Sequence, residues 1–475
     1  MIQLNQVAGK KLERFVPKQS KPRTNLHSFF KRSQAFSLTS FFVKVFLSAC
    51  TKRAGLNHDK NMKFLLSVLS ILVINFSFLN AGDWPSWRGT ARDDVSTEKG
   101  LLKSWPSGGP KKEWMSNDAG LGYAGFSVAN GALYTMGAFG GTEKLIAYRA
   151  VSSSSSNKKV WELEVGELLT NGWGDGPRTT PTVANGKVYA LGGKGNLVCA
   201  DARTGKKIWD VHMVKDLGGK VPGWGYTESV LVDEGRVICT PGGNGGALTA
   251  LDAKNGKVLW RSKEFTEPAQ YSSPIVINHG GKRQYVQLVM KKLVGIDAKN
   301  GKLVWSSDWP GKVAVIPTPI YSDGHVYISS GYGIGCKLVE LTSSGAKDVY
   351  DNKIMKNHHG GVIKIGDHLY GYSDGYGWVC QDFKTGELVW NEKKALGKGA
   401  IAYADGRFYC LGEGDGRVIL IEATPKGWTP KGEFTITPQT KQRNPKGKVW
   451  THPVIANGKM YLRDQELIFC YDISS

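Results

Sequence analysis

The stretch LDAKNGKVLW at residues 251–260 returns almost unchanged as IDAKNGKLVW at residues 296–305. Related phrases, LVCADARTGKKIW and WVCQDFKTGELVW, are centred on Asp201 and Asp382. In each phrase a glycine-containing turn separates a short apolar run from a second run that carries a tryptophan, which is typical of a β-hairpin. The chain therefore repeats one small structural unit many times.

The spacing of these phrases gives the number of repeats. Their aspartates follow one another at steps of 51, 45, 85 and 90 residues: Asp201, Asp252, Asp297, Asp382 and Asp472. The two long steps are double steps, and each contains a degenerate copy, at residues 336–350 and 418–436. A further degenerate copy, LIAYRAVSSSSSNKKVWEL, precedes Asp201. The total is eight copies.

Two more strand-like runs precede each copy, so that the repeating unit has four short strands. A four-stranded sheet has two apolar faces that it cannot bury alone, and radial packing of such sheets buries each face against a neighbour. The recurring tryptophan then acts as a wedge between blades. The pattern predicts an all-β fold, an eight-bladed β-propeller of four-stranded antiparallel blades over residues 111–475.

The last blade needs a strand from elsewhere, because the chain ends soon after Asp472. The segment KKEWMSN at residues 111–117 precedes the first full blade and places Trp114 in the wedge position. We expect this N-terminal strand to complete the last blade and close the ring, which removes the free edges of an open array. Residues 83–110 form an N-terminal extension.

The amino-terminal residues differ in composition from the rest. Residues 1–61 are rich in Lys, Arg, Ser and Phe and lack the repeat, so we expect an unstructured leader. Met62 then opens a basic and apolar stretch, which predicts a signal peptide over residues 62–82 and a true start at Met62. The mature protein would be periplasmic or extracellular, without a transmembrane span. An alternative is a lipoprotein anchor at Cys50, in the box LSAC.

The distribution of charge and the positions of the cysteines argue against several classes of function. Of the net charge of +21, residues 1–63 contribute +11, from 13 Lys/Arg and 2 Asp/Glu. The remaining positive charge is spread along the chain, which argues against nucleic-acid binding. Six of the seven cysteines lie in the repeats, mostly at recurring strand positions, and we expect them to be small buried hydrophobic residues. No spacing typical of zinc or c-type haem is present. We expect a monomer.

The loops that lead into the innermost strands crowd one face of a propeller, so their polar and aromatic residues are the binding-site candidates. We expect eight residues at this channel mouth: Trp173, Arg178, Trp224, Glu228, Gln270, His358, His359 and His452. An alternative for Arg178 and Glu228 is an ion pair between neighbouring blades. We place His358 and His359 on an innermost strand, where only one of two consecutive side chains faces the channel. The sequence assigns no catalytic residue and no metal ligand.

The unit AxDxxTGKxxW, seen as ADARTGKKIW and QDFKTGELVW, resembles the repeat of pyrroloquinoline-quinone (PQQ)-like β-propellers. With DWPSWRGTARDDVS at residues 83–96, the chain is similar to secreted members of the quinoprotein alcohol dehydrogenase-like superfamily. It is also similar to the propeller lipoprotein of outer-membrane β-barrel assembly. The first resemblance implies an alcohol or polyol dehydrogenase that uses PQQ with calcium, and the second implies a docking surface.

The dehydrogenases of that superfamily hold the quinone over a vicinal disulfide and use calcium ligands and a catalytic aspartate. This chain has no adjacent cysteines, and neither the calcium ligands nor the aspartate can be matched residue by residue. We therefore expect no cofactor and predict a binding or scaffold module for a protein, peptide or glycan ligand. A PQQ-dependent dehydrogenase, an outer-membrane assembly factor and a carbohydrate-acting protein remain alternatives.

Overall fold

Tight turns separate the short strands of this chain. In the computed structural model, which describes residues 82–150 and 159–475, Asn185 and Asp323 adopt positive φ and turn the first strand of a blade into the second. The described residues form strands and loops only, and none of them builds an apolar helix of bilayer-spanning length. The predicted leader, the predicted signal peptide up to residue 81 and Cys50 lie outside the described residues.

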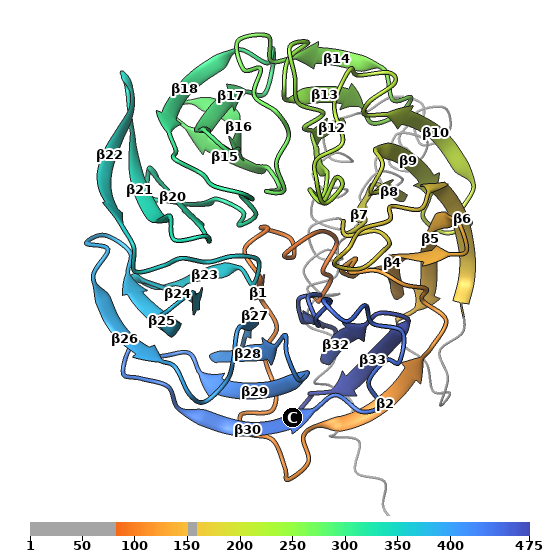
Figure 1. Cartoon of the computed structure of the whole chain (residues 1–475), viewed down its shortest axis with the longest axis vertical. Coiled ribbons are helices and arrows are strands. Elements are labelled where there is room, and N and C mark those ends of the chain that lie inside the picture. Colours follow the sequence, from red (N-terminus) through yellow and green to blue (C-terminus); the bar gives the residue numbers. More distant parts are fainter. Residues whose placement is uncertain (1–81, 151–158) are drawn as a thin grey trace, which may run out of the picture. The chain divides into compact units, whose positions relative to one another are not determined.

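The strands assemble into eight antiparallel blades around a common centre, which confirms the predicted fold (Figure 1). Blades 1 and 2 contain β3 (Ser127–Ala129), β4 (Ala132–Phe139), β5 (Thr142–Arg149), β6 (Lys159–Glu167), β7 (Thr182–Ala184), β8 (Lys187–Leu191), β9 (Asn196–Asp201) and β10 (Lys207–His212). Blades 3 and 4 contain β11 (Leu231–Asp233), β12 (Arg236–Cys239), β13 (Thr249–Asp252), β14 (Val258–Arg261), β15 (Ile275–His279), β16 (Lys282–Leu288), β17 (Lys292–Asp297) and β18 (Leu303–Asp308).

The remaining blades continue the same meander, with the first strand of each nearest the centre (Figure 1). Blades 5 and 6 contain β19 (Ile320–Ser322), β20 (His325–Ser330), β21 (Gly335–Thr342), β22 (Gly345–Asn352), β23 (Val362–Ile365), β24 (His368–Ser373), β25 (Gly377–Asp382) and β26 (Leu388–Glu392). Blades 7 and 8 contain β27 (Gly399–Ala404), β28 (Arg407–Gly412), β29 (Arg417–Glu422), β30 (Pro430–Thr435), β31 (Val454–Ala456), β32 (Lys459–Asp464) and β33 (Leu467–Asp472).

Blade 8 is closed by a strand from the other end of the chain, as predicted. Strand β2 (Lys111–Ser116) pairs antiparallel with β33, and Trp114 stands opposite Cys470. The sheet order is β2-β33-β32-β31, so that the earliest outer strand of the ring completes its last blade. Trp114 is buried against blade 1 residues, including Phe126, in the wedge position.

The recurring tryptophans lie between blades. Trp209 on β10 donates its indole N–H to the carbonyl of Ala253 in the next blade, at 3.2 Å. The same bond recurs at 3.2 Å in three further pairs: Trp161–Ala202, Trp260–Ala298 and Trp390–Thr424. Trp305 differs, because its indole N–H reaches Gln284 Oε1 of its own blade at 2.7 Å. The predicted wedge therefore also makes a hydrogen bond between blades in four of the eight neighbouring pairs.

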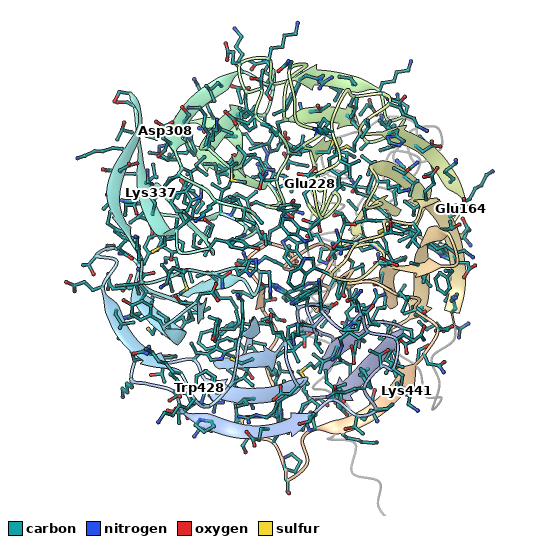
Figure 2. The ribbon with its side chains drawn as sticks, in the orientation of Figure 1. Glu164, Glu228, Asp308, Lys337, Trp428 and Lys441 are labelled. Atoms are coloured by element: carbon teal, nitrogen blue, oxygen red, sulfur yellow. The ribbon has the colours of Figure 1, made fainter. Side chains whose placement is uncertain are left out.

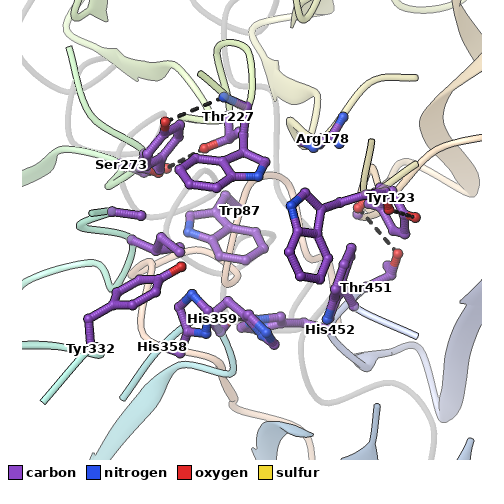
Figure 3. Close-up of a pocket in the computed structure, with 17 residues that line it drawn as sticks. Trp87, Tyr123, Arg178, Thr227, Ser273, Tyr332, His358, His359, Thr451 and His452 are labelled. Atoms are coloured by element: carbon purple, nitrogen blue, oxygen red, sulfur yellow. Dashed lines mark hydrogen bonds between the residues drawn. The ribbon is translucent and has the colours of Figure 1, made fainter. Parts of the chain in front are cut away.

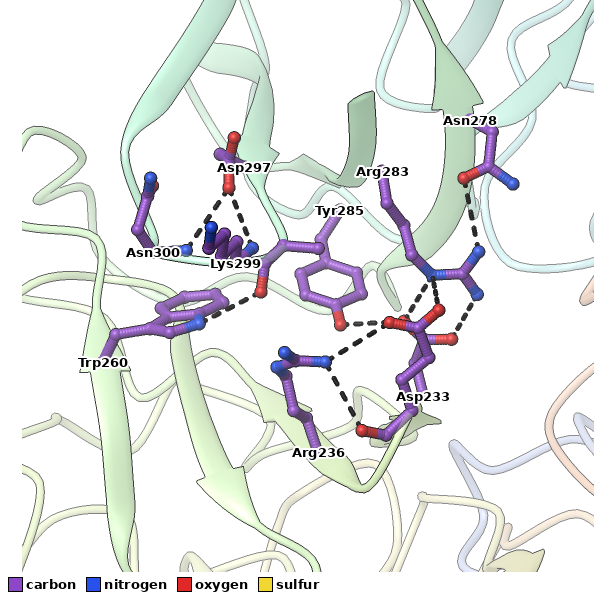
Figure 4. A network of polar contacts seen from close by, with 11 residues as sticks. Asp233, Arg236, Trp260, Asn278, Arg283, Tyr285, Asp297, Lys299 and Asn300 are labelled. Carbon is purple, nitrogen blue, oxygen red and sulfur yellow. Dashed lines mark hydrogen bonds and ion pairs between the residues drawn. The ribbon is translucent and has the colours of Figure 1, made fainter. Parts of the chain in front are cut away.

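The repeat aspartate stabilises the hairpin turn that follows it (Figure 4). Asp297 Oδ1 accepts the backbone N–H groups of Lys299 at 2.8 Å and Asn300 at 3.3 Å. Asp201 and Asp382 accept equivalent N–H groups in their own turns. A carboxylate that caps two turn amides explains why this position of the phrase is acidic.

An ion pair adds to the contact between blades 3 and 4 (Figure 4). Arg283 on β16 donates through two nitrogens to Asp233 on β11, with Nε 2.8 Å from Oδ2. The hydroxyl of Tyr285 donates to the same Oδ2 at 2.8 Å. The paired carboxylate raises the pKa of Arg283, and burial followed by the charge of Asp233 raises the pKa of Tyr285.

The six cysteines of the described residues are buried and free, in agreement with our expectation. Cys199 packs in the core formed by blades 2 and 3, together with Cys239. Burial raises the pKa of Cys199 to about 11, so this thiol is not an exposed nucleophile. The cysteines fill strand positions, as small apolar side chains do.

The N-terminal extension fills the centre of the ring. Residues 83–98, which we name the channel segment, run among the innermost strands (Figure 1). Backbone bonds join Trp84 to Val128 in blade 1 and Pro85 to Val183 in blade 2. Strand β1 (Val95–Ser96) adds to blade 7 in parallel beside β27, so this blade has five strands.

Side chains of the channel segment reach the other five blades. Arg92 donates to the carbonyls of Ser229 and Pro274, which lead into blades 3 and 4. Trp87, Arg88 and Glu98 bind groups of blades 5, 6 and 8, namely Thr318, Val362 and Gly458. The channel segment therefore contacts all eight blades.

Candidate functional site

A cavity of about 230 Å³ lies where the chain leads into the innermost strands (Figure 3). Four tryptophans and three tyrosines line it: Trp87, Trp173, Trp224, Trp450, Tyr123, Tyr271 and Tyr332. Most come from loops before the first strands of the blades, whereas Trp87 belongs to the channel segment and lies at the centre of the group (Figure 3). We call this space the mouth cavity, and Trp87 forms its floor.

The structure brings six of the eight predicted site residues together around the mouth cavity: Trp173, Arg178, Trp224, His358, His359 and His452. Trp173 stands at the rim, with 47% of its surface exposed. The ring of Trp224 packs edge-on against Tyr271, with centroids 5.6 Å apart. The predicted tryptophans thus lie at one cavity, on the loops before the successive blades 2 and 3.

Arg178 is held by its own loop. Its terminal nitrogens donate to the carbonyls of Gly176 at 2.8 Å and Gly174 at 2.7 Å, and its guanidinium lies 5.3 Å from the centre of the Tyr123 ring. Burial lowers the pKa of Arg178, although the group remains a cation near neutrality. The alternative of an ion pair with Glu228 is therefore wrong, because both terminal nitrogens bind loop carbonyls.

Glu228 and Gln270 do not line the mouth cavity. Glu228 lies near the centre of the ring but is fully buried (Figure 2). Its carboxylate accepts the backbone N–H of Thr240, and burial raises its pKa to about 7. Gln270 Oε1 accepts the N–H of Val315 at 3.2 Å, which fixes the loop before blade 5. Both residues thus bind backbone N–H groups of other segments instead of lining the cavity.

His358 and His359 both line the mouth cavity, so the expectation that only one faces the channel is wrong. The reason is that β23 begins at Val362, and the two histidines lie in the irregular loop before it. The alternation of side chains along a strand does not apply there. Their rings lie side by side, with centroids 4.7 Å apart.

Each of the two histidines has a charged partner behind it. His359 Nε2 is 3.1 Å from Glu413 Oε2, and His358 Nδ1 is 3.0 Å from Lys398 Nζ. Burial, followed by the proximity of His359 and Lys398, lowers the pKa of His358 to about 3. Burial acts to raise the pKa of Glu413, but its contacts with His359 and Lys398 outweigh it and lower the pKa. His358 is thus neutral, and Glu413 is ionised.

His452 connects the cavity to the channel segment. Its Nε2 is 2.8 Å from the carbonyl oxygen of His359, its Nδ1 is 3.4 Å from Asp94 Oδ2, and its ring lies 4.6 Å from that of Trp87. Asp94 in turn pairs with Arg88 at 2.6 Å, and both side chains are 1% exposed. Burial acts to raise the pKa of Asp94, but Arg88 and His452 outweigh it and lower the pKa. These contacts fix the channel segment, with Trp87 at the floor of the mouth cavity, to the loop that carries His452 in the cavity wall.

Sequence reasoning missed the floor and part of the walls. Trp450 lies two residues before His452, in the same predicted loop, so the loop itself was the available signal. Tyr123 and Tyr332 stand in loops without a repeated motif. Trp87 had no signal of this kind, because its position depends on the insertion of the channel segment into the ring.

Among the described residues, no aspartate or glutamate lines the mouth cavity. Throughout residues 82–150 and 159–475, no three His, Cys, Asp or Glu side chains gather in a way that could hold a metal ion. The polar groups that face the cavity are imidazoles, hydroxyls and one guanidinium, so its chemistry is that of hydrogen bonding and ring contact.

Comparison with known proteins gives a consistent family. A family model described as outer membrane protein assembly factor BamB matches residues 147–392. The dehydrogenase subunit of the quinone alcohol dehydrogenase of Komagataeibacter europaeus is 28% identical over 204 residues, which cover 41% of this chain and 26% of the relative. BamB of Moranella endobia is 30% identical over 109 residues, which cover 22% of this chain and 25% of the relative. The chain thus matches about a quarter of the length of these relatives.

Solved structures agree in fold. BamB from Moraxella catarrhalis superposes with a TM-score of 0.52 at 14% identity, covering 74% of this chain and 96% of the other. A quinohemoprotein alcohol dehydrogenase from Comamonas testosteroni superposes with a TM-score of 0.55 at 13% identity, covering 83% and 81%. At these identities the likeness concerns the fold alone.

Proposed function

We propose that this chain, which belongs to the PQQ-like β-propeller family whose model is described as outer membrane protein assembly factor BamB, is a binding module that captures an organic ligand in the mouth cavity. The observation that carries the proposal is the aromatic cavity closed from below by Trp87. A fold shared by dehydrogenases and assembly factors does not decide between functions, so the site has to do so.

The composition of the cavity supports binding. Ligand sites are concave, mostly apolar and furnished with a few convergent polar groups. Seven aromatic rings supply a large apolar surface, and Arg178 with three histidines supplies polar atoms around it. The supports of these groups, such as the loop carbonyls that hold Arg178, are already in place without a ligand. Such preorganisation lowers the entropic cost of binding.

The residues present do not fit PQQ with calcium. A quinone site of this kind needs a stacking platform and a polarising cation held by acidic ligands. The aromatic rings could supply the platform, but the described lining contains no aspartate or glutamate. The carboxylate nearest the histidine pair, Glu413, already accepts from His359 and Trp450. We therefore derive no reaction step through the quinone.

A second candidate is the docking of a protein on the same face. The exposed rings of Trp173 (47%) and Tyr332 (37%) at the rim favour it, because exposed aromatic side chains often anchor protein partners. The similarity to assembly factors supports the same idea. We propose a periplasmic or extracellular location, in keeping with the predicted signal peptide.

The test uses 1-anilinonaphthalene-8-sulfonate (ANS), a planar fluorescent probe, with the full chain. We expect one ANS molecule per chain, and at least tenfold weaker binding in Trp224→Ala and in Trp450→Ala, which remove cavity walls. Trp428→Ala, on the outer side of blade 7, is the matched control (Figure 2). Equal ANS binding in all four proteins would contradict the proposal. So would a bound chromophore with dye-linked alcohol oxidation after addition of PQQ and calcium.

A further inference from the structure

Two neighbouring histidine rings in the mouth cavity have opposite and fixed hydrogen-bonding roles. From this we infer that the cavity takes the uncharged end of a carbohydrate chain, with adjacent hydroxyl groups bound by His358 and His359. The inference rests on the proposed function, since it names the chemical class of the captured ligand. It follows from the partners behind each ring and from the closed floor.

His359 presents a hydrogen-bond acceptor. Its Nε2 faces Glu413 Oε2 at 3.1 Å, and the same oxygen accepts the indole N–H of Trp450 at 3.1 Å. An ionised carboxylate only accepts, so Nε2 of His359 carries the hydrogen. In the neutral imidazole, Nδ1 is then the lone-pair nitrogen. Within the described residues, no hydrogen bond or ion pair reaches this Nδ1.

His358 presents a hydrogen-bond donor. Its Nδ1 lies 3.0 Å from Lys398 Nζ, and Lys398 is paired with Asp374 at 2.7 Å. An ammonium group only donates, so Nδ1 of His358 accepts and its Nε2 carries the hydrogen. Among the described residues this Nε2–H has no partner. The positive charge of Lys398 also opposes protonation of the ring, so the tautomer is kept.

One acceptor and one donor therefore stand side by side, on rings whose centroids are 4.7 Å apart. A carboxylate, which only accepts, would face the lone pair of His359. An ammonium, which only donates, would face the N–H of His358. Hydroxyl groups both donate and accept, so two adjacent hydroxyls of a sugar satisfy both nitrogens. The pair is thus matched by uncharged ligands that carry adjacent hydroxyl groups.

The rest of the cavity suits a sugar ring. Tyr332 stands edge-on to His358, with centroids 4.6 Å apart, and Trp450 stands edge-on to His359 at 5.7 Å. Aromatic faces beside the histidines can cover the apolar C–H faces of a pyranose while its hydroxyls reach the imidazoles.

The closed floor explains why a chain end is favoured. Trp87 and the buried channel segment prevent a polymer from passing through the ring, so a ligand enters and leaves by the same mouth. A terminal carboxylate or ammonium of a peptide can satisfy only one of the two histidine nitrogens, because the first only accepts and the second only donates. The non-reducing end of a neutral glycan is uncharged and carries adjacent hydroxyls.

The experiment measures the tryptophan fluorescence of the full chain during titration with four neutral tetrasaccharides: maltotetraose, cellotetraose, xylotetraose and mannotetraose. Tetra-alanine and tetragalacturonate are the charged comparisons. We expect at least one neutral tetrasaccharide to bind in the mouth cavity. We expect about tenfold weaker binding of it in His358→Ala and in His359→Ala, since each loses one hydrogen bond to the ligand. His368→Ala, at the far end of blade 6, is the matched control.

The outcomes separate this inference from the proposed function. If ANS binds the cavity but none of the four sugars does, the proposed function stands and the carbohydrate inference is overturned. The inference also fails if tetra-alanine or tetragalacturonate binds more tightly than every neutral sugar, or if both histidine variants bind the sugar like the parent chain. If ANS also fails, the proposed binding function itself is wrong.

Discussion

The indole ring of Trp209 in blade 2 lies against Gly256 of blade 3, where an added Cβ would come within 2.9 Å of the ring. The same indole donates its N–H to Ala253, three residues before that glycine. The phrase at residues 251–260 thus takes part in two contacts between blades. Its Gly256 packs against the tryptophan of the preceding blade, and its Trp260 donates a hydrogen bond to the following blade. The phrase recurs because a blade that carries it can both receive the tryptophan of the preceding blade and donate its own to the following blade.

The first prediction concerns this contact. Gly256→Ala introduces a Cβ at positive φ (74°) and into the Trp209 ring, and we expect a loss of about 2–4 kcal/mol in the free energy of unfolding. The matched control is Gly235→Ala in the same blade, with a similar φ (77°) but nothing within 4 Å of the new Cβ. Its loss should be about 1 kcal/mol. Equal losses in urea unfolding would contradict the packing role of Gly256.

The ion pair between blades 3 and 4 gives a second prediction. In Arg283→Ala, the nearly buried Asp233 loses its ion pair. Its remaining hydrogen bond to blade 4 comes from the hydroxyl of Tyr285. Arg283 is 30% exposed, so we expect a moderate destabilisation of about 1–2 kcal/mol. A double-mutant cycle with Asp233→Asn measures the coupling, and additive effects would show that the pair contributes nothing.

The third prediction is a pH dependence caused by Glu228. Its pKa is raised from 4.5 to about 7 by burial, so the folded state keeps a proton that the unfolded state releases. Stability from this group is present below about pH 4.5 and is lost as the pH rises to about 7. We expect Glu228→Gln to remove this loss, so that the variant gains stability relative to the parent between these pH values.

The comparison has to be made between the two proteins, because His358 acts in the opposite direction. Its pKa is lowered from 6.5 to about 3, so its contribution rises with pH up to about 6.5 in both proteins. Unfolding midpoints at several pH values check the prediction. Parallel curves for parent and Glu228→Gln would show that Glu228 does not titrate in this range.

The fourth prediction concerns the channel segment. Arg88→Ala removes the partner of the buried Asp94, and we expect a destabilisation of about 3–5 kcal/mol. The backbone N–H groups of Val183 and Tyr403, which bind carbonyls of the segment, should exchange hydrogen faster. Lys99→Ala, at an exposed ion pair, is the control and should leave both amides protected. Unchanged protection in Arg88→Ala would mean that the ion pair does not hold the segment.

The fold could be predicted because its determinants are local and repeated. The aspartate, glycine and tryptophan of each phrase report a turn and a wedge, and eight copies fix the number of blades. The role of Trp114 followed from the same pattern, since the last blade lacked only the strand that carries such a tryptophan. Each of these residues acts through neighbours whose positions the repeat already defines.

The site could be predicted only in part, since loops carry no such regularity. Trp173 and Trp224 were found because all loops before innermost strands share one face. Glu228 was misplaced, because nothing in the sequence separates a buried carboxylate behind a wall from one that faces the cavity. The error at His358 and His359 came from the start of β23, which begins at Val362, three residues after His359. Trp87 could not be found, as its segment lies outside the repeats.

The position of the channel segment also has a consequence for synthesis. The channel segment, residues 83–98, leaves the ribosome before any complete blade, yet it binds all eight. Each newly made sheet can therefore pack against this segment in turn. Strand β2 must then wait until β33, the last strand of the ring in chain order, can pair with it. Most blades of this chain form from residues that are close together in sequence, but the pairing of β2 with β33 is a folding step of very long range. The cooperativity of folding therefore depends on this pairing.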